Sequence, residues 1–364
     1  MIILSTLIYL LAAVLFILGL KFLSSPSRAR VGNGMAALGM AIALIWTVIT
    51  LWPYFTPLGI VISIIGVVAG TVVGAIAARQ VKLTAMPQLV AIFNGVGGGA
   101  AALVALIELI NWSALTSLDS ALQPGWGTTL PSVLAIIIGG VSFSGSAIAF
   151  AKLQELMPGR PITYRGQQLS NALLGAVTLL LAVVVIVGPA SPWLLLLLLL
   201  LALGFGVAFV LPIGGADMPV VISLLNAFTG LAVAASGFIL DSFVLIIAGT
   251  LVGSSGTILT KLMSTAMGRS LSGILFGAFG QPPSSEGEVS DGAAGNVRTS
   301  SVEDIATMLA YAEGVIIVPG YGLAVAQAQH VVRELADELE QRGVEVRYAI
   351  HPVAGRMPGH MNVL

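Results

Sequence analysis

The sequence contains no cysteine and very little charge. Only 9% of its 364 residues are Asp, Glu, Lys or Arg, whereas 57% are hydrophobic. The missing cysteines exclude disulfides and thiol chemistry. The low charge excludes an ordinary soluble protein, in which about a quarter of the residues are charged. The formal net charge of −1 provides no basic surface, so nucleic-acid binding is not expected.

Long apolar runs fill most of the chain. A helix needs about 20 apolar residues to cross the hydrocarbon of a bilayer. Short breaks with Pro, Gly, Asn or charge separate runs of about this length. The runs lie near 2–24, 33–52, 57–78, 87–110, 131–151, 168–188, 192–211, 218–240 and 243–266. The sequence therefore predicts a polytopic α-helical membrane domain with nine spans over residues 1–270.

Basic residues mark one side of this domain. Every Lys and Arg in it lies near the C-terminal end of the first, third, fifth or ninth predicted span or in the connection after it, namely Lys21, Arg28, Arg30, Arg79, Lys82, Lys152, Arg160, Arg165, Lys261 and Arg269. Cytoplasmic loops are enriched in Lys and Arg, so this pattern predicts an outside N-terminus and a cytoplasmic C-terminus. Positive charge follows the first run rather than preceding it, which argues against a cleaved signal peptide.

Residues 271–300 differ in composition from the membrane domain. Within them, residues 281–300 are rich in Gly, Ser, Pro and acidic residues, and the whole stretch is predicted to be a flexible linker. Residues 301–364 then follow a soluble pattern, and they form the third predicted part of the chain.

The soluble part has the pattern of a strand–helix–strand unit. A capping box of Ser300 and Glu303 predicts a first helix. The β-branched run at 315–318 predicts a buried parallel strand. A long helix up to Arg342 and an alternating strand over 344–350 follow. Together they predict the start of an α/β, Rossmann-like domain.

The predicted strand-to-helix turn carries glycines. Gly320, Tyr321 and Gly322 match the beginning of a dinucleotide fingerprint, and Val325 replaces its usual third Gly or Ala. Such glycines let the backbone approach a pyrophosphate at a helix N-terminus. Nucleotide binding is indicated, with an ordinary tight turn as the alternative. No acidic residue follows the second strand and Arg356 is near, which favours NADP over NAD; a solvated loop residue is the alternative for Arg356.

Few polar groups lie within the predicted spans, and all three histidines fall in the soluble part. Asp217, at the start of the eighth run, is either a helix cap or a functional group. Asn94 and Asn226 either join helices or order water along a polar path. Ser254 and Ser255 stand between glycines and indicate a close-packing face or a water-lined kink. These residues are compatible with two classes of protein. One is a redox enzyme coupled to ion movement, and the other is a transporter or channel regulated by a cytoplasmic dinucleotide-binding domain.

Longer motifs resemble the beta subunit of proton-translocating NAD(P) transhydrogenase. They lie at 39–43, 86–91, 214–226, 251–256, 319–329 and 351–362. The resemblance implies hydride transfer between NAD(H), held by a partner alpha subunit, and NADP(H), held by this chain. It also implies proton passage through the membrane domain, location in the inner membrane, and a dimer of alpha–beta units. No side chain is expected to act as a catalyst, because the hydride passes directly between nicotinamide rings, and no metal site is expected.

The resemblance also assigns residues to two sites. Positions linked to the proton path and its coupling are Asp217, Asn226, Asn94, Ser254 and Ser255. The nucleotide site is expected at Gly320, Tyr321, Gly322, Val325, Ala326, His351, Pro352, Val353, Ala354, Gly355 and Arg356.

Two features depart from the family pattern. Many relatives carry a membrane histidine where this chain has Asn94, and others carry it on the second span, which has none here. Asparagine cannot titrate, so ordered water, Asp217 and a partner helix all stay open as the proton carrier. The nucleotide fold also reaches only its second strand by Leu364. We therefore expect residues 301–364 to be the N-terminal part of an incomplete NADP-binding domain.

Overall fold

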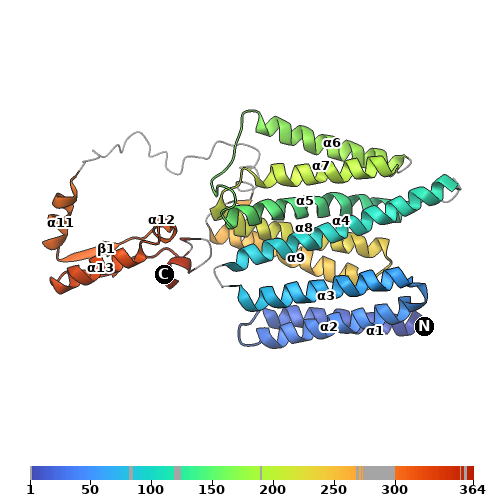
Figure 1. Cartoon of the computed structure of the whole chain (residues 1–364), viewed down its shortest axis with the longest axis horizontal. Helices are drawn as coiled ribbons and strands as arrows, with labels where there is room; N and C mark the ends of the chain where they lie inside the picture. The colour runs from blue at the N-terminus through green and yellow to red at the C-terminus, as the bar shows by residue number, and fades with distance from the viewer. Residues whose placement is uncertain are drawn as a thin grey trace.

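The computed structural model describes residues 2–81, 85–118, 124–188, 191–267, 270–271, 273, 300–352, 354–355 and 359–364. Within these ranges, nine helices are long and apolar enough to cross a membrane, and they lie side by side as a bundle (Figure 1). They are α1 (Ile2–Leu23), α2 (Ala29–Leu51), α3 (Pro57–Gln80), α4 (Met86–Leu118), α5 (Trp126–Leu153), α6 (Gln167–Val187), α7 (Pro192–Val210), α8 (Met218–Ile239) and α9 (Phe243–Ala266). Each predicted span is thus confirmed as a helix.

Several helices are longer than the predicted spans. The fourth span was expected to end near residue 110, but α4 continues to Leu118, and α5 begins at Trp126 rather than at Pro131. Hydropathy marks only the part of a helix that matches the hydrocarbon, so it misses the less apolar turns beyond. Pro131 lies early in α5, where it does not end the helix.

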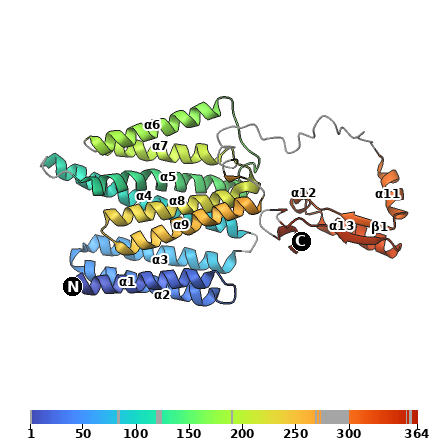
Figure 2. The same cartoon turned by 180° about the vertical axis from the view of Figure 1, so that it is seen from behind.

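The helices alternate in direction through the bundle. The C-terminal ends of the odd-numbered helices lie together at one end, and the N-terminus of the chain lies at the other (Figures 1 and 2). The described basic residues of the membrane domain therefore lie toward one end of the bundle, as the charge pattern predicts.

The bundle is centred on α5 and α8, which have the largest buried shares of the nine helices. Glycines allow close approach around this centre. A Cβ atom added to Gly139 of α5 would lie 2.5 Å from the carbonyl oxygen of Gly98 of α4. Glycine at both positions therefore permits close backbone contact between α4 and α5. In contrast, α3 contains no buried residue.

The soluble part contains α11 (Val302–Ala310), β1 (Gly314–Ile317), α12 (Tyr321–Val325), α13 (Gln329–Gln341), β2 (Glu345–Tyr348) and α14 (His360–Val363). The two strands are parallel, and their register pairs Gly314 with Glu345 and Ile317 with Tyr348. This is one strand–helix–strand unit. Most of the expected linker, residues 274–299, lies outside the described residues.

Three local predictions for this part are wrong. The capping box is made by Ser301 and Asp304, one position later than predicted, because both reciprocal bonds form there. The predicted long helix is divided into α12 and α13, since Gln327 has a φ of 51°. The first strand was expected to be buried, but Ile316 is 64% exposed because the described residues cover only one face of the sheet.

Candidate functional site

A polar cluster lies inside the bundle at Asn94 of α4, whose side chain is buried at 6% exposure. Its Nδ2 atom donates hydrogen bonds to the hydroxyl oxygens of Ser142 and Ser146 at 3.2 and 2.9 Å. Both serines belong to α5 and stand four positions apart, so they occupy the same helical face. Asn94 therefore joins α4 to α5.

The cluster continues to α8. The Ser142 hydroxyl donates to the carbonyl oxygen of Leu225 at 2.8 Å and lies 2.5 Å from the hydroxyl of Thr229. Thr229 in turn donates to the backbone oxygen of Asn94 at 3.4 Å. Asn94, Ser142, Ser146 and Thr229 are called the Asn94 cluster below. The expectation that Asn94 joins helices is confirmed.

The cluster retains a spare acceptor. The Oδ1 atom of Asn94 is buried and accepts no hydrogen bond from the described residues. Hydroxyl groups both donate and accept, whereas Asn and Ser do not titrate near neutrality. The cluster can therefore order water and pass hydrogen bonds along, but it cannot itself store a proton. A buried amide oxygen without a protein donor is the kind of atom that binds internal water.

Asp217 lies where the connection from α7 enters α8. It ends a short 3₁₀ helix, η3 (Gly215–Asp217), and its side chain is buried. Although Asp217 occupies the N-cap position of α8, its side chain makes no capping hydrogen bond. A hydrogen-bonding cap therefore does not explain this carboxyl group.

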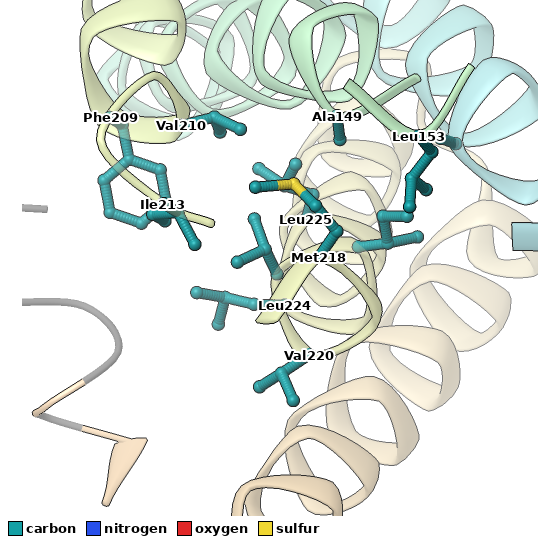
Figure 3. Close-up of a cluster of buried hydrophobic side chains, with 12 residues drawn as sticks. Ala149, Leu153, Phe209, Val210, Ile213, Met218, Val220, Leu224 and Leu225 are labelled. Atoms are coloured by element: carbon teal, nitrogen blue, oxygen red, sulfur yellow. The ribbon is translucent and has the colours of Figure 1, made fainter. Parts of the chain in front are cut away.

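Apolar packing fixes the residues on both sides of Asp217. Met218, which follows it, is fully buried, and Ile213 before it is 4% exposed. Figure 3 shows side chains of α7 and α8 and the connection between them meeting those of α5. The carboxyl group of Asp217 therefore lies on a segment that apolar packing holds in place on both sides.

Sequence reasoning missed two polar side chains at this end of the bundle. Lys152 is only 2% exposed, and its Nζ atom donates to the carbonyl oxygens of Leu211 and, at 2.8 Å, of Ile213. Gln88 of α4 donates from Nε2 to the carbonyl oxygen of Leu153 at 3.1 Å. Lys152 was counted only as a charge that sets topology. Its position at the C-terminal end of a predicted span, where a lysine is normally solvated, gave no signal of the burial.

Four of the five residues predicted for the proton path lie outside the Asn94 cluster. Asp217 is one of them, and the other three lie on α8 and α9. Asn226 is half-buried on α8, and its side chain makes no hydrogen bond to the described residues. Ser254 and Ser255 are exposed on α9. The glycines that flank them pack closely on α8, as a Cβ atom on Gly256 would lie 3.0 Å from Ala227. The close-packing interpretation therefore holds for the glycines, while the serines face away from α8.

The predicted nucleotide turn connects β1 to α12. Gly320 is the N-cap residue of α12 and has extended backbone angles, with φ −94° and ψ 170°. A Cβ atom on Gly320 or Gly322 would meet nothing within 4 Å. Neither backbone strain nor protein packing requires these glycines, and the open space over them fits the close approach of a phosphate group. Val325 lies in α12 and is exposed, and Ala326 caps that helix.

The second predicted nucleotide segment folds back onto this turn. The rings of Tyr321 and His360 have centroids 5.7 Å apart. Gly355 has a φ of 117°, and a Cβ atom there would lie 2.6 Å from the His360 ring. His351 and Pro352 are exposed, Ala354 is half-buried, and Val353 and Arg356 lie outside the described residues. The fold thus brings the two predicted segments together.

The bundle and the small α/β unit define a polytopic helical membrane protein with a nucleotide-type turn. The family model for the NAD(P) transhydrogenase beta subunit matches residues 5–364. NAD(P) transhydrogenase subunit beta of Rhodospirillum rubrum is 47% identical over 360 residues, which are 98% of this chain and 75% of that protein. A second sequence from a Rhodospirillum rubrum strain gives the same values. The chain belongs to the NAD(P) transhydrogenase beta subunit family and is therefore a component of an enzyme complex.

Proposed function

We propose that this chain binds NADP(H) in its soluble part and couples hydride exchange with NAD(H) on an alpha subunit to proton passage through α4, α5 and α8. The observation that carries the proposal is the Asn94 cluster. It joins these three helices by polar contacts within a bundle whose buried residues are mostly apolar. Polar groups within a membrane bundle are costly and mark ion or proton pathways.

The nucleotide half of the proposal is supported by the turn at Gly320. Its backbone is open where a pyrophosphate would approach, and the N-terminus of α12 supplies N–H donors there. His351 and Pro352 lie on the segment that folds back beside Tyr321. NADP, when bound, supplies the hydride chemistry. The protein binds it, orients its nicotinamide and excludes competing reactions.

The proton half is supported by the burial of Asp217. This carboxyl group belongs to the same helix as Thr229 of the Asn94 cluster, and it lies at the end of the bundle where the odd-numbered helices finish. Asp217 can exchange a proton, which Asn94 cannot. We infer that Asp217 takes up or releases the proton on the side that faces the NADP-binding part. Positive charge at the same end supports a cytoplasmic location for that side.

Exposed groups in the bundle support assembly with other chains. Ser254 and Ser255 face outward from an apolar helix, where lipid offers no hydrogen bonds. Gly66, Gly70 and Gly74 of α3 form a row with open space over each one. Rows of small residues are typical surfaces for packing between transmembrane helices. Helices of an alpha subunit or of a second alpha–beta unit, in a dimer within the inner membrane, are the proposed neighbours.

Replacement of Asp217 by Asn tests the proton step. In the complex reconstituted with an alpha subunit in vesicles, we expect proton-coupled hydride transfer to fall at least about tenfold, because the exchangeable carboxyl group is lost. NADPH binding should persist. Asp241→Asn is a matched control, since Asp241 is exposed in the connection between α8 and α9 at the opposite end. Unchanged coupled turnover and an unchanged pH profile in Asp217→Asn would contradict the assignment.

One groove in the bundle gives no support to the transporter alternative. The groove between α4, α5 and α7 is lined by Val96, Gly99, Ala100, Ala102, Leu103, Gly140, Phe143, Leu199 and Leu203. These side chains offer no polar group that would recognise a solute. Measurement of NADPH binding by nicotinamide fluorescence distinguishes the two classes further, because a tight NADPH site with no transported solute is expected of the transhydrogenase.

A further inference from the structure

Lys152 is a buried cation at the C-terminal end of α5. Its side chain is 2% exposed. Among the described residues, no carboxylate lies within 4 Å of its Nζ atom, so its hydrogen bonds go to the carbonyl oxygens of Leu211 and Ile213. A buried charge costs free energy unless polar groups compensate it. Here the carbonyl dipoles that end α7 provide the compensation.

The bonds of Lys152 fix the segment that leads to Asp217. Leu211 follows the last residue of α7, and Ile213 is the last residue before Gly214 and η3. The ammonium group therefore binds both ends of the tight turn, residues 211–213, that follows α7. This turn contains Pro212 and cannot be held by a regular helical hydrogen-bond ladder.

Backbone bonds connect the same segment to the loop that follows α5. The Ile162 N–H donates to the Leu211 carbonyl at 3.2 Å, and the Gly215 N–H donates to the Gly159 carbonyl at 2.7 Å. Lys152 lies just before this loop in the chain. The connection between α5 and α6 and the connection between α7 and α8 are thus joined as one unit, with Lys152 as its charged contact.

The helix that carries Lys152 also carries the serines of the Asn94 cluster. Ser146 precedes Lys152 by less than two helical turns, about 9 Å along the axis. One rigid helix therefore contacts Asn94 through its serines and the Asp217 segment through its lysine. A shift of α5 at either place moves the other.

We propose that Lys152 is a positioning residue that holds the Asp217 segment in register with the Asn94 cluster. The role assigned to Asp217 rests on the proposed function, whereas the contact between Lys152 and the segment does not. Loss of the ammonium group releases the turn at Leu211–Ile213, and the carboxyl group of Asp217 then loses its fixed place at the end of α8.

The positional part is tested by thiol labelling, since the natural chain contains no cysteine. Gly214→Cys introduces a single thiol in a tolerated conformation, because Gly214 has φ −74° and a Cβ atom there would lie 3.6 Å from Pro161. In the assembled complex, Lys152→Met should raise the labelling rate of this thiol at least about tenfold, because two charge-assisted hydrogen bonds are lost. Lys152→Arg should restore slow labelling.

Two controls accompany the labelling. Arg160→Cys, at an exposed position in the neighbouring loop, should react equally fast in the parent and Lys152→Met backgrounds. Lys21→Met removes the same charge from an exposed site on α1 and should leave the Gly214→Cys rate unchanged. Equal labelling rates for Gly214→Cys in the parent and Lys152→Met backgrounds, in folded protein, would overturn the proposal.

The functional part is tested by a double-mutant cycle. If Lys152 acts through Asp217, Lys152→Met should lower the kcat of proton-coupled hydride transfer with an unchanged KM for NADP, and adding Asp217→Asn should cause no further loss. A general stabilising role predicts independent, additive losses, and additivity would overturn the positioning role. If Asp217→Asn alone has no effect, the proposed function of Asp217 fails, while the labelling result still decides whether Lys152 holds the segment.

Discussion

The rings of Tyr321 and His360 lie 5.7 Å apart and connect two segments that are distant in the sequence. Tyr321 follows the N-cap glycine of α12, and His360 begins α14. Because Gly355 also approaches the His360 ring, this contact brings the second segment to the turn. The proposed NADP(H) site would therefore involve both segments.

Gly322→Val tests the nucleotide turn. The added side chain meets no protein atom in the present fold, so the thermal midpoint should stay within about 2 °C. The affinity for NADPH should fall at least about tenfold, because the side chain fills the space over the backbone. Nicotinamide fluorescence in a titration measures the affinity, and retention of full affinity would show that the turn does not contact the nucleotide.

Gly343→Ala is the complementary change in the same unit. Gly343 has a φ of 84°, which an alanine adopts only with strain, so the soluble unit should lose about 1 kcal/mol of stability. The NADPH affinity of the folded fraction should not change, since Gly343 lies between α13 and β2, away from the turn. Hydrogen exchange of the β2 amides would reveal the local loss.

Gly139→Ala should destabilise the membrane bundle. The new methyl group would lie 2.5 Å from a backbone oxygen of Gly98, which cannot move without separating α4 from α5. Overpacking of this kind costs about 1–3 kcal/mol. Thermal unfolding in detergent measures the loss. Gly66→Ala on α3 is the control, because its Cβ meets nothing, and an equal loss there would contradict the packing argument.

Asn94→Leu should weaken the contact between α4 and α5 and interrupt proton passage. Hydrogen bonds between transmembrane helices contribute about 0.6 kcal/mol each on average, so only a small fall in thermal stability is expected. Coupled turnover should fall strongly even though stability changes little, since the free acceptor atom, Oδ1 of Asn94, is lost. Asn94→Gln, which retains the amide, should keep more coupled activity than Asn94→Leu; equal activities would remove the Asn94 cluster from the proton path.

Single-cysteine labelling also tests the orientation of the chain. Arg160→Cys lies in the connection after α5, and Tyr54→Cys lies in the exposed connection between α2 and α3. In sealed inside-out vesicles, an impermeant maleimide should label Arg160→Cys and spare Tyr54→Cys. Right-side-out vesicles should give the reverse, and the opposite result would invert the proposed topology.

The sequence predicts the helices well and the polar contacts poorly, for physical reasons. Apolar length is a property of each segment, so each of the nine spans is found without its neighbours. The hydrogen-bond partners of Asn94 lie on other helices. The sequence around Asn94 therefore cannot predict that it contacts Ser142 or Thr229. The spacing of Ser142 and Ser146 by about one helical turn was the only local sign that α5 presents a polar face. Lys152 was misjudged because charge at a helix end is normally solvated.

The soluble part shows the same division. The parallel pairing of β1 and β2 follows from local pattern and the helical crossover between them. The exposure of Ile316 cannot be predicted from local pattern, because the burial of a strand depends on which other residues cover it. The break between α12 and α13 at Gln327 could not be predicted either. The residues around Gln327 favour a helix, and only the positive φ of this one residue interrupts it.

The contact between Gly98 and Gly139 also bounds the Asn94 cluster on one side. It lies one helical turn beyond Asn94 on α4 and closes the seam between α4 and α5, backbone against backbone. On the proposed proton path, water that entered from the Asp217 end would stop at this seam. The membrane voltage, worth about 2.3 kcal/mol per charge at 100 mV, would then act across the helix turns beyond it.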